Sequence, residues 1–276
     1  MAAHEPMTGA HEIAFEAFGV RLAVSASDPE ALDMVSANLP PGWRPCSPQD
    51  ARPHFALLRE LAGTYTLTRD GEALHQGLEL DLCIGLLDGQ LRSELSTRTQ
   101  DWVFVHAGVV AHSGRIALLP GESFAGKTTL TAELVRLGAT YYSDEFAVLD
   151  EHGLVHPYAK GLSLRDNGRM QRSDTPVERL GGRAGTEPLP VGLVAFTQYR
   201  RDSTWEPEPL TAGEGVLALL AHTMPARTRP AASMRALSRA LGRGAVVLRS
   251  PRGEAKELAP LLIEVLRGGG SGDRDA

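Results

Sequence analysis

Residues 121–128 form a complete match to the phosphate-binding loop pattern G-x-x-x-x-G-K-[ST]. An apolar run at residues 116–120 precedes this loop, and a helical pattern at residues 129–137 follows it. The strand–turn–helix context is what gives the pattern its meaning. The chain has only three lysines, so a lysine falls at this position by chance very rarely. The sequence therefore predicts that the chain binds a nucleotide.

The residues of this loop have separate expected roles. The glycines allow backbone N–H groups to face phosphate oxygens, and the start of the helix adds a partial positive charge. Lys127 is expected to neutralise the β- and γ-phosphates, and the Thr128 hydroxyl is expected to ligate Mg²⁺. The predicted cofactors are ATP and Mg²⁺, and the predicted nucleotide contacts are Gly121, Glu122, Ser123, Phe124, Ala125, Gly126, Lys127, Thr128 and Thr129.

Composition argues against several other classes of protein. The 276 residues carry a net charge of −6, so no basic excess is available for general nucleic-acid binding. No apolar run approaches the ~18 residues of a membrane span, and the first ten residues lack the pattern of a signal peptide. Cys46 and Cys83 stand far apart, which favours two buried free thiols over a zinc site. We expect a cytoplasmic protein with no membrane or nucleic-acid partner, and a homo-oligomer stays open.

Apolar patterning predicts a smaller N-terminal α/β region at residues 1–95. Alternation over residues 12–24 indicates one or two strands, and a helix is expected to begin near Asp28. The strand at residues 65–69 leads into an Asp70-Gly71 turn, which indicates a hairpin. Residues 78–95 fit either a helix or a turn.

The catalytic domain is predicted at residues 96–267, followed by a disordered glycine-rich tail at residues 268–276. Gly138 is expected to end the helix that follows the phosphate loop. Residues 166–190 show little periodicity and are interpreted as a mobile loop. The remaining predicted elements are strands at residues 140–149, 191–199 and 245–248 and helices at residues 213–222, 233–241 and 254–266.

Asp144 and Glu145 are the expected acidic partners of the phosphate loop. They lie 17 and 18 residues after Lys127, on the strand that follows the loop helix. A nucleotide site of this kind needs a carboxylate to hold Mg²⁺ or to accept a proton from the attacking hydroxyl. Adjacent strand residues point to opposite faces, so only one of the pair would face the phosphates unless the strand kinks. Asp144 is the first choice, and a solvated acidic pair is the alternative.

Two further residues are weaker candidates. His106 lies 21 residues before Lys127 in an otherwise apolar strand, where a satisfied core histidine is the more common explanation. Arg165 is one of 25 arginines, so its position alone says little. An arginine near a transferring phosphoryl group would stabilise the charge on its equatorial oxygens.

Taken together, these landmarks resemble the HPr kinase/phosphorylase family. The matching segments are residues 105–109, the phosphate loop, residues 134–138, residues 143–145 and residues 162–165, in the same order and at similar spacing. The chain resembles still more closely the HPr-kinase-related proteins, which include peptide or protein serine kinases and kinases of free serine. The implied fold is α/β (α+β), with a P-loop kinase core on a mixed sheet like that of HPr kinase and phosphoenolpyruvate carboxykinase.

The resemblance also implies roles for individual residues. His106 would orient the base, Lys127 would hold the phosphates, Asp144 would be the general base and Arg165 would stabilise the transition state. The implied metal ligands are Thr128, Asp144 and Glu145. The chain departs from the family at Ser163, where a glutamate is usual, which predicts weak or absent phosphorylase activity.

Three functions follow from these observations. The first is an ATP-dependent kinase acting on a serine-type hydroxyl of a peptide or protein. The second is a kinase of a small molecule such as free serine or a similar hydroxy metabolite. The third is a non-catalytic ATP-binding accessory protein.

Overall fold

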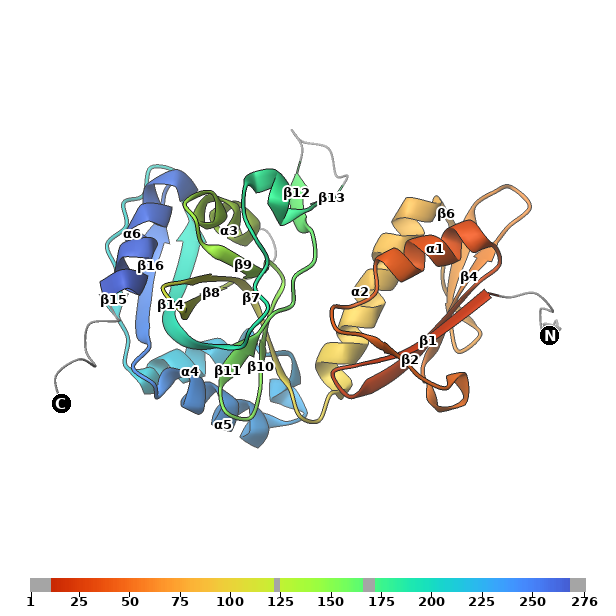
Figure 1. The fold of residues 1–276 in the computed structure, drawn as a ribbon, viewed down its shortest axis with the longest axis horizontal. Coiled ribbons are helices and arrows are strands. Elements are labelled where there is room, and N and C mark those ends of the chain that lie inside the picture. Colours follow the sequence, from red (N-terminus) through yellow and green to blue (C-terminus); the bar gives the residue numbers. More distant parts are fainter. Residues whose placement is uncertain (1–10, 122–124, 166–171, 269–276) are drawn as a thin grey trace. The chain divides into compact units, whose positions relative to one another are not determined.

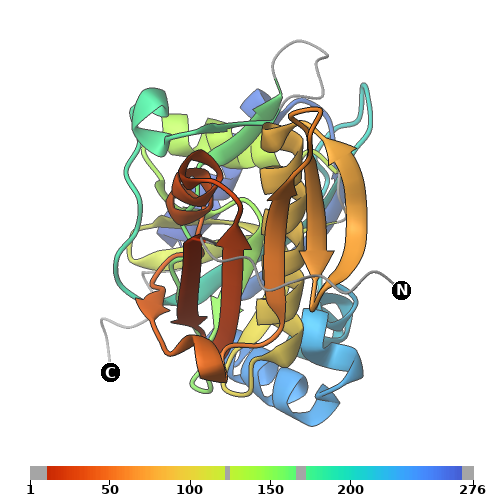
Figure 2. The same ribbon diagram turned by 90° about the vertical axis from the view of Figure 1, so that its right-hand side faces the viewer.

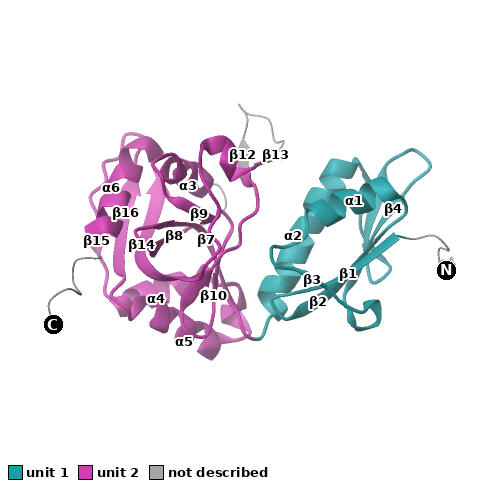
Figure 3. Cartoon of the chain, in the orientation of Figure 1, with its two compact units in different colours: residues 1–100 teal, residues 101–276 magenta. Residues whose placement is uncertain are grey.

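The computed structural model describes residues 11–121, 125–165 and 172–268, and of residues 163–165 and 172–174 only the backbone. The chain divides into two compact units, residues 1–100 and 101–276, which are coloured separately in Figure 3. Helix α2 (Leu80–Arg98) runs through the predicted boundary at residue 95. Both units are mixed α/β structures, each with its own mixed sheet.

The first unit is built on a six-stranded sheet, whose strands lie side by side in Figure 2. The sheet order is β3-β1-β2-β4-β5-β6, and only the β2/β4 pair is parallel. Two hairpins turn at Phe18-Gly19 and Asp70-Gly71, where all four residues have positive φ. The Asp70-Gly71 hairpin confirms the sequence prediction. The strands are β1 (His11–Ala17), β2 (Val20–Ala26), β3 (Arg44–Pro45), β4 (His54–Arg59), β5 (Tyr65–Arg69) and β6 (Glu72–Leu78).

Helices α1 (Pro29–Ala37) and α2 cover one face of this sheet. Helix α1 begins as predicted, because the Asp28 side chain accepts a hydrogen bond from the Ala31 N–H at 3.0 Å. The ambiguous segment 78–95 is helical, because Cys83, Leu87, Leu91 and Leu95 bury one apolar face against the strands. A short 3₁₀ helix, η1 (Pro48–Asp50), precedes β4.

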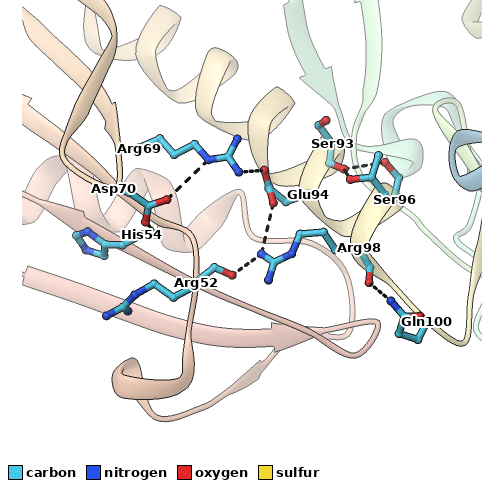
Figure 4. A network of polar contacts seen from close by, with 10 residues as sticks. Arg52, His54, Arg69, Asp70, Ser93, Glu94, Ser96, Arg98 and Gln100 are labelled. Atoms are coloured by element: carbon cyan, nitrogen blue, oxygen red, sulfur yellow. Dashed lines mark hydrogen bonds and ion pairs between the residues drawn. The ribbon is translucent and has the colours of Figure 1, made fainter. Parts of the chain in front are cut away.

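A polar network centred on Glu94 joins α2 to the sheet of the first unit (Figure 4). Glu94 is only 7% exposed, and its carboxylate lies 2.8 Å from the Arg69 guanidinium and 3.4 Å from that of Arg98. Arg98 also donates to the Arg52 carbonyl. Burial of a carboxylate is tolerated here because two guanidinium groups compensate its charge.

The second unit contains the phosphate loop and an eight-stranded sheet. Its order is β11-β10-β7-β8-β14-β16-β15, with β9 also paired to β7 and the start of β14 also paired to β11. Strands β8, β14 and β16 are mutually parallel, so their carboxyl ends meet at one edge of the sheet. The strands are β7 (Val103–His112), β8 (Arg115–Pro120), β9 (Thr140–Ser143), β10 (Phe146–Leu149), β11 (Leu154–His156), β14 (Leu189–Tyr199), β15 (Glu208–Pro209) and β16 (Val246–Arg252).

Helices cover both faces of this second sheet (Figure 1). Helices α3 (Lys127–Arg136) and α6 (Ala255–Gly268) pack on one face, and α4 (Ala212–Leu220) and α5 (Pro230–Leu241) pack on the other. Successive residues of β8 alternate between the two cores, Ile116 and Leu118 facing one and Ala117 and Leu119 the other. Gly138 has φ of +93° and follows the last turn of α3, as predicted.

Several sequence predictions need correction. Residues 172–190 are not a featureless loop: they contain β13 (Arg172–Thr175), which pairs with β12 (Leu162–Arg165), and the short helix η2 (Val177–Leu180). Residues 166–171 and 269–276 lie outside the described part of the chain, and Gly268 belongs to α6. A further short helix, η3 (Met224–Arg227), separates α4 from α5.

Cys83 and Cys46 are both free thiols, but only Cys83 is fully buried, whereas Cys46 is partly exposed. Burial raises the pKa of the Cys83 thiol to about 11. No helix within residues 11–121, 125–165 and 172–268 has the length and apolarity needed to cross a membrane.

Candidate functional site

The phosphate-loop motif joins β8 to α3, as the sequence predicts. Pro120 ends β8, and Lys127 is the first residue of α3, two residues earlier than expected. Gly126 precedes the helix with φ of +79°, a left-handed conformation that glycine adopts readily. The Lys127 ammonium donates a hydrogen bond to the Gly121 carbonyl at 3.0 Å, across the base of the loop. Glu122, Ser123 and Phe124 lie outside the described residues.

The start of α3 is suited to an anion. Among the described side chains none caps this helix, which begins directly after Gly126. The first N–H groups of a helix have no partner within the helix and carry a partial positive charge. Together with the Lys127 ammonium, they make this end of α3 a site where phosphate oxygens are favoured.

Thr128 and Asp144 meet beneath the loop. The Thr128 hydroxyl donates to one oxygen of the Asp144 carboxylate at 3.1 Å, and the Tyr141 hydroxyl donates to the other at 3.0 Å. Asp144 is only 7% exposed, so these contacts fix its position. A carboxylate held against a loop hydroxyl offers two hard oxygen donors side by side, the type that Mg²⁺ prefers. This pair therefore fits a magnesium site.

The chain breaks between β9 and β10 at Asp144-Glu145. Both strands pair with β7, but the two acidic residues between them belong to neither strand. The Ser143 hydroxyl oxygen accepts hydrogen bonds from the N–H groups of Glu145 and Phe146, at 3.1 and 2.9 Å. Side-chain alternation along a regular strand therefore does not apply to the acidic pair. A kink in the strand at this position, which the sequence allows, is present in the structure.

His106 lies on β7 next to this break. It pairs with Phe146 on β10, and their rings are 6.2 Å apart. The following residue, Ala107, pairs with Pro120 at the end of β8 and donates its N–H to the Glu145 carbonyl at 3.1 Å. The topology therefore brings His106, the acidic pair and the loop to the same edge of the sheet. His106 is partly exposed, and its backbone N–H donates to the His222 carbonyl at 2.8 Å.

Arg165 is the last residue of β12, where it pairs with Arg172. Strand β12 packs against α3, since Leu162 belongs to the same core as that helix. The side chain of Arg165 is outside the described part of the structure, so its role stays a prediction.

Arg252 is a residue that sequence reasoning missed. It is 2% exposed, and its guanidinium donates to the Gly126 carbonyl at 3.0 Å and to the Gly253 carbonyl at 2.9 Å. It also lies 5.5 Å from the centre of the Tyr199 ring. Its Nε atom has no hydrogen-bond partner among the described residues, and burial lowers the pKa of the guanidinium from its usual value. The sequence prediction ended this strand at residue 248, whereas β16 continues to Arg252.

A cavity of about 580 Å³ opens beside the loop, at the carboxyl ends of β14 and β16. Pro120, Gly121 and Ala125 form its boundary with the loop. The remaining walls come from residues 196–200, from His222 and from residues 249–251. The parallel arrangement of β8, β14 and β16 creates this hollow, because ligand crevices form where parallel strands end.

No group of three or more His, Cys, Asp or Glu side chains gathers as a metal site within the described residues. This finding is compatible with the Thr128–Asp144 pair, because Mg²⁺ commonly uses one or two protein ligands and completes its shell with waters and substrate phosphates.

No protein-family model matches the chain, and no curated protein is significantly similar to it in sequence. The functional conclusion therefore depends on the motif residues and on the geometry around them.

Proposed function

We propose that this protein is an ATP-dependent kinase that transfers the γ-phosphoryl group to a serine-type hydroxyl of a peptide or protein. The observation that carries the proposal is the contact between Thr128 and Asp144 beneath a phosphate loop. The resemblance of residues 100–166 to HPr-kinase-related proteins supports it, and so does the position of His106 at the same sheet edge. On this proposal, the second unit is a P-loop kinase core of the HPr kinase type.

The proposed donor-binding residues follow from the loop. Backbone N–H groups at the start of α3 and the Lys127 ammonium would hold the phosphates of ATP, which supplies the transferred group. Thr128 and Asp144 would hold Mg²⁺, which neutralises charge on the β- and γ-phosphates when bound. Arg165 would stabilise charge on the transferring group.

The proton of the acceptor hydroxyl needs a base. Asp144 is the proposed base, with Glu145 and His106 beside it. Asp144 would also contribute to the Mg²⁺ site, because one of its oxygens contacts the Thr128 hydroxyl while the other accepts from Tyr141. The two roles can be separated experimentally, since loss of a metal ligand is compensated by high Mg²⁺ and loss of a base is not.

The test is single-turnover transfer from γ-labelled ATP to a serine-containing peptide mixture and, in parallel, to free serine. At saturating Mg²⁺ we expect Asp144→Asn to lower the rate at least ~10²-fold, because a positioned base contributes ~10²–10⁴-fold. Glu145→Gln is the matched control and should lower the rate less. Lys127→Ala should strongly weaken ATP binding itself.

Several outcomes would decide against the proposal. Wild-type rates in Asp144→Asn would show that Asp144 is not the base. If excess Mg²⁺ restores the transfer rate of Asp144→Asn, Asp144 acts only as a metal ligand. Transfer to free serine but to no peptide would favour the small-molecule kinase, and ATP binding without any transfer would favour an accessory protein.

A further inference from the structure

The cavity beside the phosphate loop has walls that suit a planar aromatic group. Phe196, Tyr199 and His222 contribute rings to its lining. The Arg249 guanidinium lies 5.8 Å from the centre of the Phe196 ring, so a cation and an aromatic face form one wall together. Nucleobases stack on aromatic rings and on arginine planes, because each base has a polarisable π-face.

The charge of the cavity also limits its occupant. Arg200 and Arg249 are part of its lining, and none of the described residues that line it carries a carboxylate. A neutral or anionic ligand is therefore favoured over a cationic one. The volume of about 580 Å³ lies within the range of small-molecule sites, which is roughly 300–1,000 Å³.

The position of the cavity relative to the acidic pair bears on which substrate, donor or acceptor, would occupy the cavity. Strand β8 lies between β7 and β14 in the sheet. His106, Asp144 and Glu145 are on the β7 side of the loop, and most of the cavity wall comes from β14 and β16 on the other side of β8. His222, whose carbonyl accepts from the His106 backbone N–H, is the part of the lining that borders the β7 side.

In the proposed transfer, the acceptor oxygen forms a bond to the γ-phosphorus as the bond from that phosphorus to the β–γ bridging oxygen breaks. The hydroxyl proton passes to the carboxylate, and ADP leaves with the bridging oxygen. The attacking and leaving oxygens are roughly in line, on opposite sides of the phosphorus. An acceptor on the acidic side therefore requires the leaving nucleotide to extend toward β14.

We propose that the cavity at the ends of β14 and β16 binds the nucleoside of the phosphoryl donor, with its base against the wall formed by Phe196 and Arg249. The direction in which the donor extends rests on the proposed kinase function. The chemical class of the ligand rests on the residues that line the cavity. Arg249 is exposed and outside both cores of this unit, so it can be changed without disturbing the fold.

The experiment compares two probes that share phosphates but differ in the nucleoside: ATP and inorganic triphosphate, each with Mg²⁺. Binding is measured by calorimetry with the full chain. Arg249→Ala should weaken ATP binding by about tenfold, the scale of a lost stacking or cation–π contact, and leave inorganic triphosphate binding within twofold. Lys127→Ala should weaken both probes. Arg235→Ala, on the exposed side of α5, is the matched control and should change neither.

A second variant, Thr197→Trp, adds bulk at a position that lines the cavity. It should exclude ATP while inorganic triphosphate still binds, and the retained triphosphate binding reports that the loop is folded. Equal losses of both probes in Arg249→Ala, or ATP binding unchanged in both variants, would overturn the inference. Unchanged ATP binding would mean that the cavity binds the acceptor or no ligand at all.

These outcomes are distinct from failure of the proposed function, because they concern equilibrium binding only. A chain that shows the expected selectivity between the probes but transfers phosphate to no acceptor retains the nucleoside site and loses the kinase assignment.

Discussion

At the scale of single residues, the phosphate loop is supported from below by a buried arginine. Arg252 reaches from the end of β16 to the carbonyl of Gly126, the residue that immediately precedes α3. A Cβ atom at Gly126 would overlap this guanidinium, so a larger residue at that position would displace the arginine. The contact links the strand that borders the cavity to the helix that would face the phosphates.

Replacement of Arg252 is expected to weaken nucleotide binding. Arg252→Met removes the charged hydrogen bond to Gly126 and a buried positive charge close to the loop. Because this hydrogen bond holds the residue that precedes α3, its loss should displace the start of the helix, and we expect the dissociation constant of Mg·ATP to rise by about tenfold. Arg252→Lys retains the charge and should show a smaller loss. The measurement is the dissociation constant, followed in parallel with the melting temperature.

A purely structural Arg252 gives a different pattern. In that case Arg252→Met would lower the melting temperature while the folded protein binds Mg·ATP with the wild-type constant. Gly126→Ala offers an independent check from the other side of the contact, and it should reproduce the binding loss while Arg252 itself is unchanged.

At the scale of elements, helix α1 illustrates how one side chain sets both a start and a tertiary contact. The Asp28 carboxylate accepts from the Ala31 N–H and also from the Tyr65 hydroxyl, at 3.0 and 2.9 Å. Tyr65 is buried. Burial is the larger cause, and the hydrogen bond to Asp28 the next, of a raised pKa of its hydroxyl. One residue therefore joins the beginning of α1 to strand β5.

Asp28→Ala should destabilise the first unit. Loss of a helix cap costs about 1 kcal/mol, and the buried Tyr65 hydroxyl would lose an acceptor in addition. Asp28→Asn should retain much of the stability, since asparagine also caps helices well. Amide exchange in α1 is the measurement, and Glu30→Ala in the exposed first turn is the control. Equal exchange rates in wild type and Asp28→Ala would exclude the capping role.

Local chemistry made much of the fold predictable from the sequence. The Asp70-Gly71 turn, the Asp28 helix start and the Gly138 helix end each depend on neighbouring residues, and each is found where expected. Helix α2 was ambiguous because Asp88-Gly89 within its apolar pattern could equally form a turn, and packing of one face of the helix against the sheet decides the structure. The β12–β13 pair was missed because β13 is a short polar segment without a clear pattern.

The candidate site also has some features that could be predicted from the sequence and others that depend on the tertiary structure. The phosphate loop and the acidic pair were found from spacing, but the break between β9 and β10 depends on a hydrogen-bonded turn at Ser143 that alternation does not reveal. Arg252 could not be found from the sequence, because its contact with Gly126 spans 126 residues of chain and no local pattern indicates it. The cavity arises only when β14 and β16 are placed beside β8.

At the scale of the whole molecule, the chain has separate apolar cores. Among the described residues, the main core of residues 1–100 lies between the sheet and its two helices, with a small second cluster at Ala14, Ala23 and Ala51, and two large cores lie on opposite faces of one sheet within residues 101–276. Opening of one unit therefore need not expose the core of the other. Ligand binding at the phosphate loop is expected to protect the unit that contains it.

Mg·ATP at 100 times its dissociation constant should stabilise the second unit by about 2.7 kcal/mol. Native-state amide exchange of the full chain is the measurement, because it reports each unit separately. Slowly exchanging amides in β8, β14 and α3 should gain protection, and those in β1, β2 and α2 should not. An equal gain in both units would show that the two open as one cooperative body. The Lys127→Ala variant should show no gain in either.

The buried guanidinium of Arg252 has a practical consequence for handling the protein. Its Nε atom has no hydrogen-bond partner among the described residues, and its other nitrogens donate to the Gly126 and Gly253 carbonyls, next to a helix end that also favours anions. On the proposed function, we therefore expect sulfate or phosphate from a purification buffer to compete with the phosphates of the donor. Apparent affinities should depend on the buffer anion more strongly than on ionic strength, and a chloride or acetate buffer gives the cleaner reference state.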